Sequence, residues 1–211
     1  MPTKQYYLDS NKTEPLTIEW KGIYKDFKVS LKDSEVLHFE NKKALENGAE
    51  YRIDENRLLT VRLTKKKYTG FENLEILVNN EPVKGSPTDP FEIVKGVCEL
   101  LFVIAALNVI LGLIAELFSI ELLLNYGLGF GTVIAGLIYT ILGFLIKLKN
   151  SLIALVLSIF LLAADAILSF ASMASGSATG FTFKLIFILL LWRGIRAIRE
   201  IKKRELKAIG N

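Results

Sequence analysis

Apolar and polar residues alternate along much of the chain between residues 16 and 83. A side-chain period of two is typical of strands with one buried face, and it recurs in the segments LTIEW, DFKVSL, LTVRL and NLEILV. Turn-forming residues separate these segments, at Lys32-Asp33, at 54–56 and at Asn79-Asn80. Residues 1–89 are therefore predicted to form a small antiparallel β-sandwich or barrel of about six to eight strands. The residues expected to face its core are Leu16, Ile18, Trp20, Phe27, Val29, Leu31, Leu59, Val61, Leu63, Leu74, Ile76 and Val78.

Beyond this region the pattern changes to long, nearly continuous apolar runs. A helix needs about 20 apolar residues to cross a hydrocarbon layer about 30 Å thick. The first run begins with helix-start signals, because Asp89 is a good N-cap and Pro90 suits the first helical position. The sequence therefore predicts an α+β membrane protein, in which the N-terminal β-sandwich or barrel is followed by a four-helix transmembrane bundle over residues 90–198. The predicted spans are 90–118, 128–147, 151–173 and 181–198.

Lysine and arginine are distributed unevenly among the connections between these spans. The first connection (SIELLLNYGLGFG) and the third (SMASGSATGFTF) contain neither residue, whereas the second (IKLKNS) contains two lysines. Loops rich in Lys and Arg stay on the cytoplasmic side, so both termini are predicted to be cytoplasmic, in a bacterial inner or internal membrane. The N-terminus has no apolar signal-peptide core, which agrees with a cytoplasmic β-domain.

The C-terminal end of the chain is strongly basic, and the chain as a whole has a net charge of +4. Residues 199–211 are predicted to continue the fourth helix into the cytoplasm, where basic side chains are attracted to the anionic lipids of the inner leaflet. Aromatic residues are not interleaved with these charges, so nucleic acid is not an expected partner. The candidate headgroup-binding residues are Arg193, Arg196, Arg199, Lys202, Lys203, Arg204 and Lys207.

Candidate catalytic chemistry is sparse. His38 is the only histidine and Cys98 the only cysteine, so neither an internal disulfide nor a zinc site of the usual kind can be built. The sequence contains no P-loop, dinucleotide fingerprint or nucleophile elbow. We therefore expect a non-enzymatic protein without catalytic residues, metal or cofactor. The basic segment 64–71 (TKKKYTGF) is expected to be a hairpin tip, either simply solvated or in contact with anionic headgroups or a partner.

Polar and ionisable residues interrupt the apolar spans. Such residues usually face protein or water, and they are functional-site candidates. Asp165 is predicted to lie past the midplane, toward the outer side. A spacing of seven residues joins it to Ser151, Ser158 and Ser172 in one stripe, with Ser169 beside them. The intramembrane polar residues singled out are Asn108, Glu116, Ser158, Asp165, Ser169, Ser172 and Lys184.

Small residues form comparable stripes in the first two spans. Small side chains let helix backbones approach closely, and their polar groups can bond across the contact. Stripes that face one another would give a compact bundle. The first stripe contains Ala105, Asn108, Gly112, Ala115 and Ser119, and the second contains Thr132, Gly136, Thr140 and Gly143.

Two interpretations of Asp165 are open at this point. In the structural one it pairs with Asn108, with the serines or with Lys184, inside the bundle or between subunits. Lys184 can alternatively extend toward the membrane surface or pair with Glu116. In the functional interpretation, Asp165 is a protonatable or ion-binding group that lines a path.

The order of segments also resembles that of a known set of proteins. The stretches TIEWKGIYKDFKVSL and NLEILVNNEPVKGSPTDP, followed by four apolar spans, resemble uncharacterised membrane proteins from photosynthetic bacteria. The resemblance covers nearly the whole chain and implies a small N-terminal β-domain followed by four helices, with no assigned activity. The stretch NLEILVNNEPV is also similar to the strand-turn-strand pattern of Fas-apoptosis inhibitory molecule-type β-domains.

Two functions are compatible with these features. The first is an integral membrane protein whose cytosolic β-domain acts as an interaction or sensing module for a cytosolic protein partner, anchored by a helical bundle that can self-associate. The alternative is a homo-oligomeric ion channel or small transporter, with Asn108 and Asp165 near the path.

Overall fold

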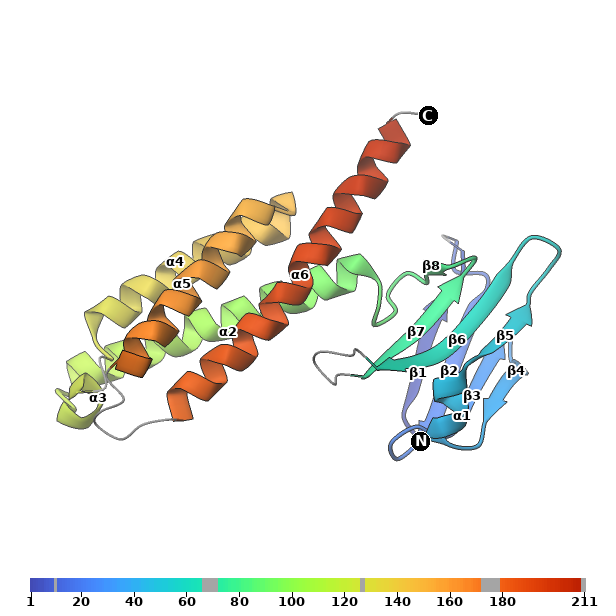
Figure 1. Ribbon diagram of the computed structural model, residues 1–211, viewed down its shortest axis with the longest axis horizontal. Helices are drawn as coiled ribbons and strands as arrows, with labels where there is room; N and C mark the ends of the chain where they lie inside the picture. Colours follow the sequence, from blue (N-terminus) through green and yellow to red (C-terminus); the bar gives the residue numbers. More distant parts are fainter. Residues whose placement is uncertain (10, 66–71, 126–127, 172–178, 210–211) are drawn as a thin grey trace. The chain divides into compact units, whose positions relative to one another are not determined.

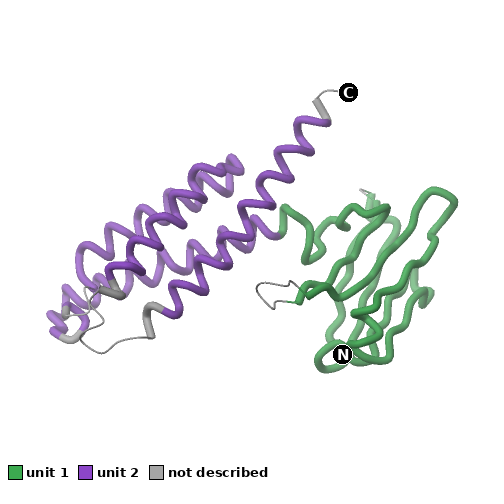
Figure 2. The backbone as a smooth tube through the Cα atoms, in the orientation of Figure 1, with its two compact units in different colours: residues 1–92 green, residues 93–211 purple. Residues whose placement is uncertain are grey.

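The computed structural model describes residues 1–211 except for 10, 66–71, 126–127, 172–178 and 210–211. The chain divides into two compact units, residues 1–92 and residues 93–211 (Figure 2). The first unit consists mainly of β-strands and the second of α-helices, which confirms the predicted α+β class (Figure 1). We call them the β unit and the helical unit.

The β unit contains two four-stranded antiparallel sheets, with strand orders β1-β2-β3-β4 and β5-β6-β7-β8. Apolar residues from both sheets meet in a single core, as in a β-sandwich. A short helix, α1, that was not predicted lies between β4 and β5. The elements are β1 (Thr3–Tyr7), β2 (Pro15–Lys21), β3 (Lys25–Leu31), β4 (Ser34–Phe39), α1 (Lys42–Asn47), β5 (Ala49–Arg52), β6 (Leu58–Lys65), β7 (Glu72–Val78) and β8 (Glu81–Pro82).

The predicted alternation and turns account for most of this unit. Among the residues expected in the core, Trp20, Leu31 and Val78 are partly buried, and the others are buried. Two predicted turns have positive φ at both central residues, 49° and 64° at Lys32-Asp33 and 51° and 65° at Asn79-Asn80. This is the geometry of a type I′ hairpin turn, which matches the twist of the strands that it joins.

An ion-pair network joins the two sheets through Glu14, which directly precedes β2, and Arg57, which directly precedes β6. Arg57 Nη1 lies 2.5 Å from Glu14 Oε2, and Lys32 Nζ lies 2.9 Å from Glu14 Oε1. Arg57 also pairs with Asp54 at 2.6 Å. Hydrogen bonds from Arg57 and Lys32 lower the pKa of Glu14 to about 2.

This low pKa predicts that the β unit loses stability in acid. The Glu14 carboxylate stabilises the fold fully above the unfolded-state pKa of about 4.3, and this contribution is lost as the pH falls toward about 2. We expect the unfolding temperature, followed by Trp20 fluorescence with Trp192→Phe in every protein compared, to fall more steeply in the wild type than in Glu14→Gln. The exposed Glu55→Gln is the matched control and should follow the wild type. An equal fall in Glu14→Gln and wild type would contradict this role.

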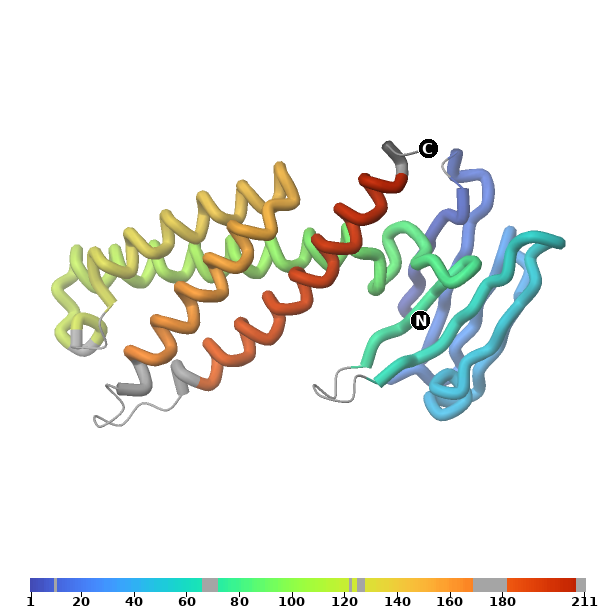
Figure 3. The backbone as a smooth tube through the Cα atoms, turned by 45° about the horizontal axis from the view of Figure 1, so that its top comes forward, coloured from blue at the N-terminus to red at the C-terminus, as the bar shows by residue number. Residues whose placement is uncertain are grey.

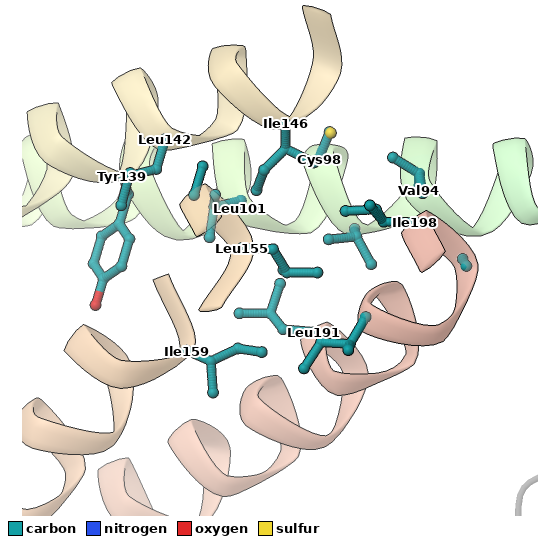
Figure 4. Packing of buried hydrophobic residues seen from close by; sticks show 14 of the residues in the cluster. Val94, Cys98, Leu101, Tyr139, Leu142, Ile146, Leu155, Ile159, Leu191 and Ile198 are labelled. Carbon is teal, nitrogen blue, oxygen red and sulfur yellow. The ribbon is translucent and has the colours of Figure 1, made fainter. Parts of the chain in front are cut away.

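The helical unit is built around one core shared by its four long helices (Figure 4). Leu101, Ile146, Leu155 and Leu191, one from each helix, are completely buried there. A second short helix that was not predicted, α3, lies in the first connection. The helices are α2 (Pro90–Leu117), α3 (Glu121–Asn125), α4 (Phe130–Lys149), α5 (Leu152–Ala171) and α6 (Thr179–Ile209).

The expectation of four membrane spans is supported for two helices only. Among the described residues, α2 and α4 are long and apolar enough to cross a membrane, judged by length and composition. The apolar segment found within the described part of α5, Leu152–Leu168, is shorter. Helix α6 continues without a break to Ile209, so the predicted fourth span and basic tail form one helix in which apolar residues are followed by many charges.

Candidate functional site

The small-residue stripes of the first two spans face each other in the structure. A Cβ atom at Gly136 of α4 would lie 2.8 Å from the carbonyl oxygen of Ala105 in α2 and 3.1 Å from the amide nitrogen of Val109. A Cβ atom at Gly112 of α2 would lie 2.8 Å from the carbonyl oxygen of Gly129. These glycines therefore allow the backbones of α2 and α4 to approach more closely than any side chain would permit.

Helices α4 and α5 are joined by a tight turn and diverge beyond it (Figure 3). Asn150 adopts the left-handed conformation in this turn (φ 46°), and its N–H donates to the carbonyl oxygen of Ile146 at 2.9 Å. A pocket of about 270 Å³ is lined by residues of α2, α4 and α5. We call this pocket the α4–α5 cleft. Its polar lining residues are Asn108, Thr132, Tyr139 and Asp165, and its apolar lining includes Ile138 and Leu161.

Asp165 forms an ion pair with Lys184, which joins α5 to α6. Lys184 Nζ lies 2.7 Å from Asp165 Oδ2 and donates to the carbonyl oxygen of the same residue at 3.4 Å. The Asp165 side chain nevertheless remains 53% exposed, compared with 23% for Lys184. Among the described residues considered as partners from the sequence, Lys184 is the one that pairs with Asp165, and much of the carboxylate stays accessible.

The other polar residues of the helices mainly bond to backbone carbonyls of their own helix. Asn108 Nδ2 donates to Ile104 at 2.8 Å, and Thr140 Oγ1 donates to Gly136 at 3.0 Å. Ser158 is completely buried, and its hydroxyl donates to Ala154 at 2.8 Å. Ser158 and Asp165 therefore lie in the same stripe of α5, but Ser158 is buried and Asp165 is half-exposed. Ser172 and the side chain of Ser169 lie outside the described residues.

Glu116 does not pair with Lys184 but caps a neighbouring helix. Its Oε1 accepts a hydrogen bond from the backbone N–H of Phe130, the first residue of α4, at 2.9 Å. The preceding residue, Gly129, has no side chain that could accept this N–H, so the carboxylate of α2 supplies the acceptor. The interaction fixes the beginning of α4 against the end of α2.

The basic residues of α6 occupy the sides of the helix that are not packed on the core. Ile195, Ile198 and Ile201 are buried, whereas most of the basic side chains between and beyond them are exposed. Arg204 is half-buried and pairs with Glu200 at 2.7 Å, and Arg193 is half-buried as well. The exposed basic residues are Arg196, Arg199, Lys202, Lys203 and Lys207.

In the β unit, His38 belongs to an exposed ion-pair cluster. His38 Nε2 lies 2.8 Å from Asp26 Oδ1, and Lys21 pairs with the other oxygen of Asp26 at 2.6 Å. These hydrogen bonds, first from Lys21 and then from His38, lower the pKa of Asp26. Where residues are described, no three His, Cys, Asp or Glu side chains are grouped to hold a metal ion. Of the predicted hairpin tip at 64–71, residues 64–65 end β6, and 66–71 lie outside the described residues.

Two hollows meet at Tyr7, the last residue of the edge strand β1; one continues along β1 and the other along the β7–β8 hairpin. They measure about 530 Å³ and about 610 Å³, and both are lined by Tyr7, Asp9 and Lys84. Arg57 contributes to the first hollow, and the half-exposed Phe91 contributes to the second. This edge of the β unit therefore combines concave shape, aromatic surface and charge.

The structure also allows a direct test of the Asp165–Lys184 pair. Asp165→Asn and Lys184→Met should each lower the unfolding temperature in mild detergent, because each leaves one partner without its counter-charge. The double variant should recover part of the loss, with a coupling energy of about 0.5–3 kcal/mol, as is typical of contacting residues. Glu121→Gln, an exposed carboxylate on α3, is the control. Strictly additive losses would contradict a structural pair.

Comparison with protein-family models, with curated proteins and with solved structures finds no match to this chain.

Proposed function

We propose that this protein is an integral membrane protein in which the helical unit anchors a cytoplasmic binding module, the β unit. The observation that carries the proposal is the apolar side chains exposed on all four long helices. Of the most apolar windows of α2 and α4, only 33% and 28% is buried. Water-soluble monomers rarely expose apolar surface on this scale, whereas lipid covers it at no cost. The exposed residues include Val103, Leu107, Ile110, Ile134, Leu137, Ile141, Ile153, Phe160, Ile167, Leu185, Leu189 and Trp192.

The proposed anchor crosses the membrane four times, with both termini in the cytoplasm. Lys147 and Lys149 lie in the last turn of α4, and the exposed basic residues of α6 lie near its C-terminal end. In four consecutive spans these two ends are on the same side, and basic residues mark that side as cytoplasmic. The basic residues of α6 would then contact the anionic headgroups of the inner leaflet.

The hydrogen bonding inside the helical unit supports an anchoring role. Asn108, Thr140 and Ser158 each donate to their own helix, and Asp165 pairs with Lys184. Polar groups that are paired within the protein stabilise helices and helix contacts in lipid. Their presence in the helices is therefore explained without a transported ion.

A binding role for the β unit is supported by the two hollows that meet at Tyr7 of β1. An edge strand presents unpaired backbone groups, and a neighbouring concave surface with aromatic and charged residues is typical of a protein-binding site. We therefore propose a cytosolic protein as the partner, bound at the edge that carries Tyr7 and Lys84.

Site-specific photo-crosslinking in native membranes tests this proposal. A photoreactive residue at position 84 of the full-length chain should give a discrete crosslinked product that Tyr7→Ala abolishes. The same residue at position 43, an exposed lysine on α1 that lines neither hollow, is the control. Identical products from both positions, or a product at position 84 that survives Tyr7→Ala, would contradict binding at this edge.

One observation favours a second candidate, a channel or small transporter. Asn108 and Asp165, the two residues placed near a path from the sequence alone, line the same cleft. In reconstituted vesicles this candidate predicts ion or solute flux that Asp165→Asn reduces without unfolding the protein. Absence of flux from well-folded wild-type protein would contradict the channel or transporter function and favour the anchored binding module.

A further inference from the structure

We propose that the α4–α5 cleft binds a small molecule or headgroup that carries a primary ammonium group. This inference concerns the helical unit alone and does not rest on the binding role proposed for the β unit. It starts from the clustering of polar groups. Polar side chains from three different helices, at Asn108, Tyr139 and Asp165, line one pocket of about 270 Å³.

The groups that line the cleft are suited to a hydrogen-bond donor. Asp165 offers carboxylate oxygens, and Asn108 offers an amide oxygen, because its Nδ2 already donates to Ile104. The hydroxyl oxygen of Tyr139 is a further acceptor. Figure 4 shows the ring of Tyr139 extending from α4 toward α5, with the hydroxyl at its far end. A primary ammonium has three N–H donors, one for each of these three side chains that line the cleft.

Lys184, which does not line the cleft, shows that Asp165 accepts an ammonium group. Its ammonium lies 2.7 Å from Asp165 Oδ2, while the carboxylate remains half-exposed. The protein's own lysine therefore already occupies part of the acceptor that a ligand would use. A ligand ammonium can take the remaining oxygen or displace Lys184, so the lysine acts as an internal competitor.

The cleft lies beside the first half of α4. Thr132 lies two residues after the first residue of α4, and Tyr139 lies seven residues further along. At about 1.5 Å per residue the lining extends about 10 Å along the helix from near its N-terminal end. Helices α4 and α5 diverge in the same direction, away from their shared turn at Asn150 (Figure 3). In the proposed topology this end faces the non-cytoplasmic side, so a ligand can enter from that aqueous phase or from the outer leaflet.

Titration of the full-length protein in mild detergent tests the assignment. Ethanolamine and a short-chain phosphatidylethanolamine are the two probes, and choline and the matching phosphatidylcholine are their controls, because a quaternary ammonium has no N–H donor. We expect at least one primary amine to bind at least about tenfold more tightly than its trimethylated control. Binding of ethanolamine indicates entry from water, and binding of the lipid alone indicates entry from the bilayer.

Variants link the binding to the cleft. Asp165→Asn should weaken binding of the primary amine about tenfold or more, and Tyr139→Phe should weaken it several-fold. Lys184→Met should strengthen it, because the internal competitor is removed. Glu121→Gln, which changes a carboxylate outside the cleft, should leave the affinity unchanged. Equal binding of primary and quaternary amines, or unchanged affinity in well-folded Asp165→Asn protein, would overturn the assignment.

Discussion

Replacing Phe27 with alanine is expected to unfold the β unit under conditions in which the wild type is stable. Phe27 is completely buried, and its ring packs against Trp20, Tyr24 and Phe39 with centroid distances of 5.9–6.3 Å. Truncating a buried phenylalanine costs about 3–5 kcal/mol, since both burial and packing are lost. A loss of this size is a large fraction of the total stability of a small domain.

Denaturation of the full-length protein measures this effect. Trp20 contacts Phe27 and reports on the β unit once the other tryptophan is removed by Trp192→Phe. Ile23→Ala, at a side chain that is 74% exposed, is the control and should change the stability by less than about 0.5 kcal/mol. A loss below about 1 kcal/mol in Phe27→Ala would contradict the packing of Phe27 in the core described here.

Replacing Gly136 with alanine is expected to destabilise the helical unit by about 1–3 kcal/mol. The new methyl group would lie 2.8 Å from the carbonyl oxygen of Ala105 and 3.1 Å from the amide nitrogen of Val109. Both are backbone atoms of α2, so the clash can be relieved only by moving one helix away from the other. This separation also loosens the contacts of α4 in the shared core.

Gly96→Ala provides an unusually direct control. Gly96 also lies within a long helix, but a Cβ atom there would have nothing within 4 Å. The same substitution should therefore raise the unfolding temperature in detergent, by the roughly 1 kcal/mol advantage of alanine over glycine in a helix. We therefore expect Gly136→Ala to lower the unfolding temperature and Gly96→Ala to raise it. Equal effects would mean that α2 and α4 do not approach at Gly136.

The strands were predictable from sequence because each carries its own local signal. A buried face every second residue fixes which side chains of β2, β3, β6 and β7 enter the core, and Asn79-Asn80 fixes a hairpin. Helix α1 was missed because it has only six residues. Its signals were present, however: Asn41 accepts a hydrogen bond from the backbone N–H of Ala44, and Gly48 ends the helix with a positive φ of 74°.

The candidate site was only partly predictable from sequence, because its contacts join residues of different helices. The small-residue stripes predicted that helices approach closely along them, and α2 and α4 do so at Gly112 and Gly136. The partner of Glu116 was not predicted, since it depends on where the chain returns after α3 and on the missing side chain of Gly129. Tyr139 was also overlooked, although it lies seven residues after Thr132 and therefore on the same side of α4.

The central claim is that the helical unit spans the membrane four times and holds the β unit in the cytoplasm. Single-cysteine labelling in intact cells tests this topology most directly. In a Cys98→Ala background, one cysteine is placed at each of the exposed positions 43, 119 and 207, and a membrane-impermeant thiol reagent is added outside. The account predicts labelling at position 119, between α2 and α3, with positions 43 and 207 labelled only after the membrane is opened. Labelling of 43 or 207 in intact cells, or protection of all three positions, would contradict a cytoplasmic β unit held by a four-span anchor.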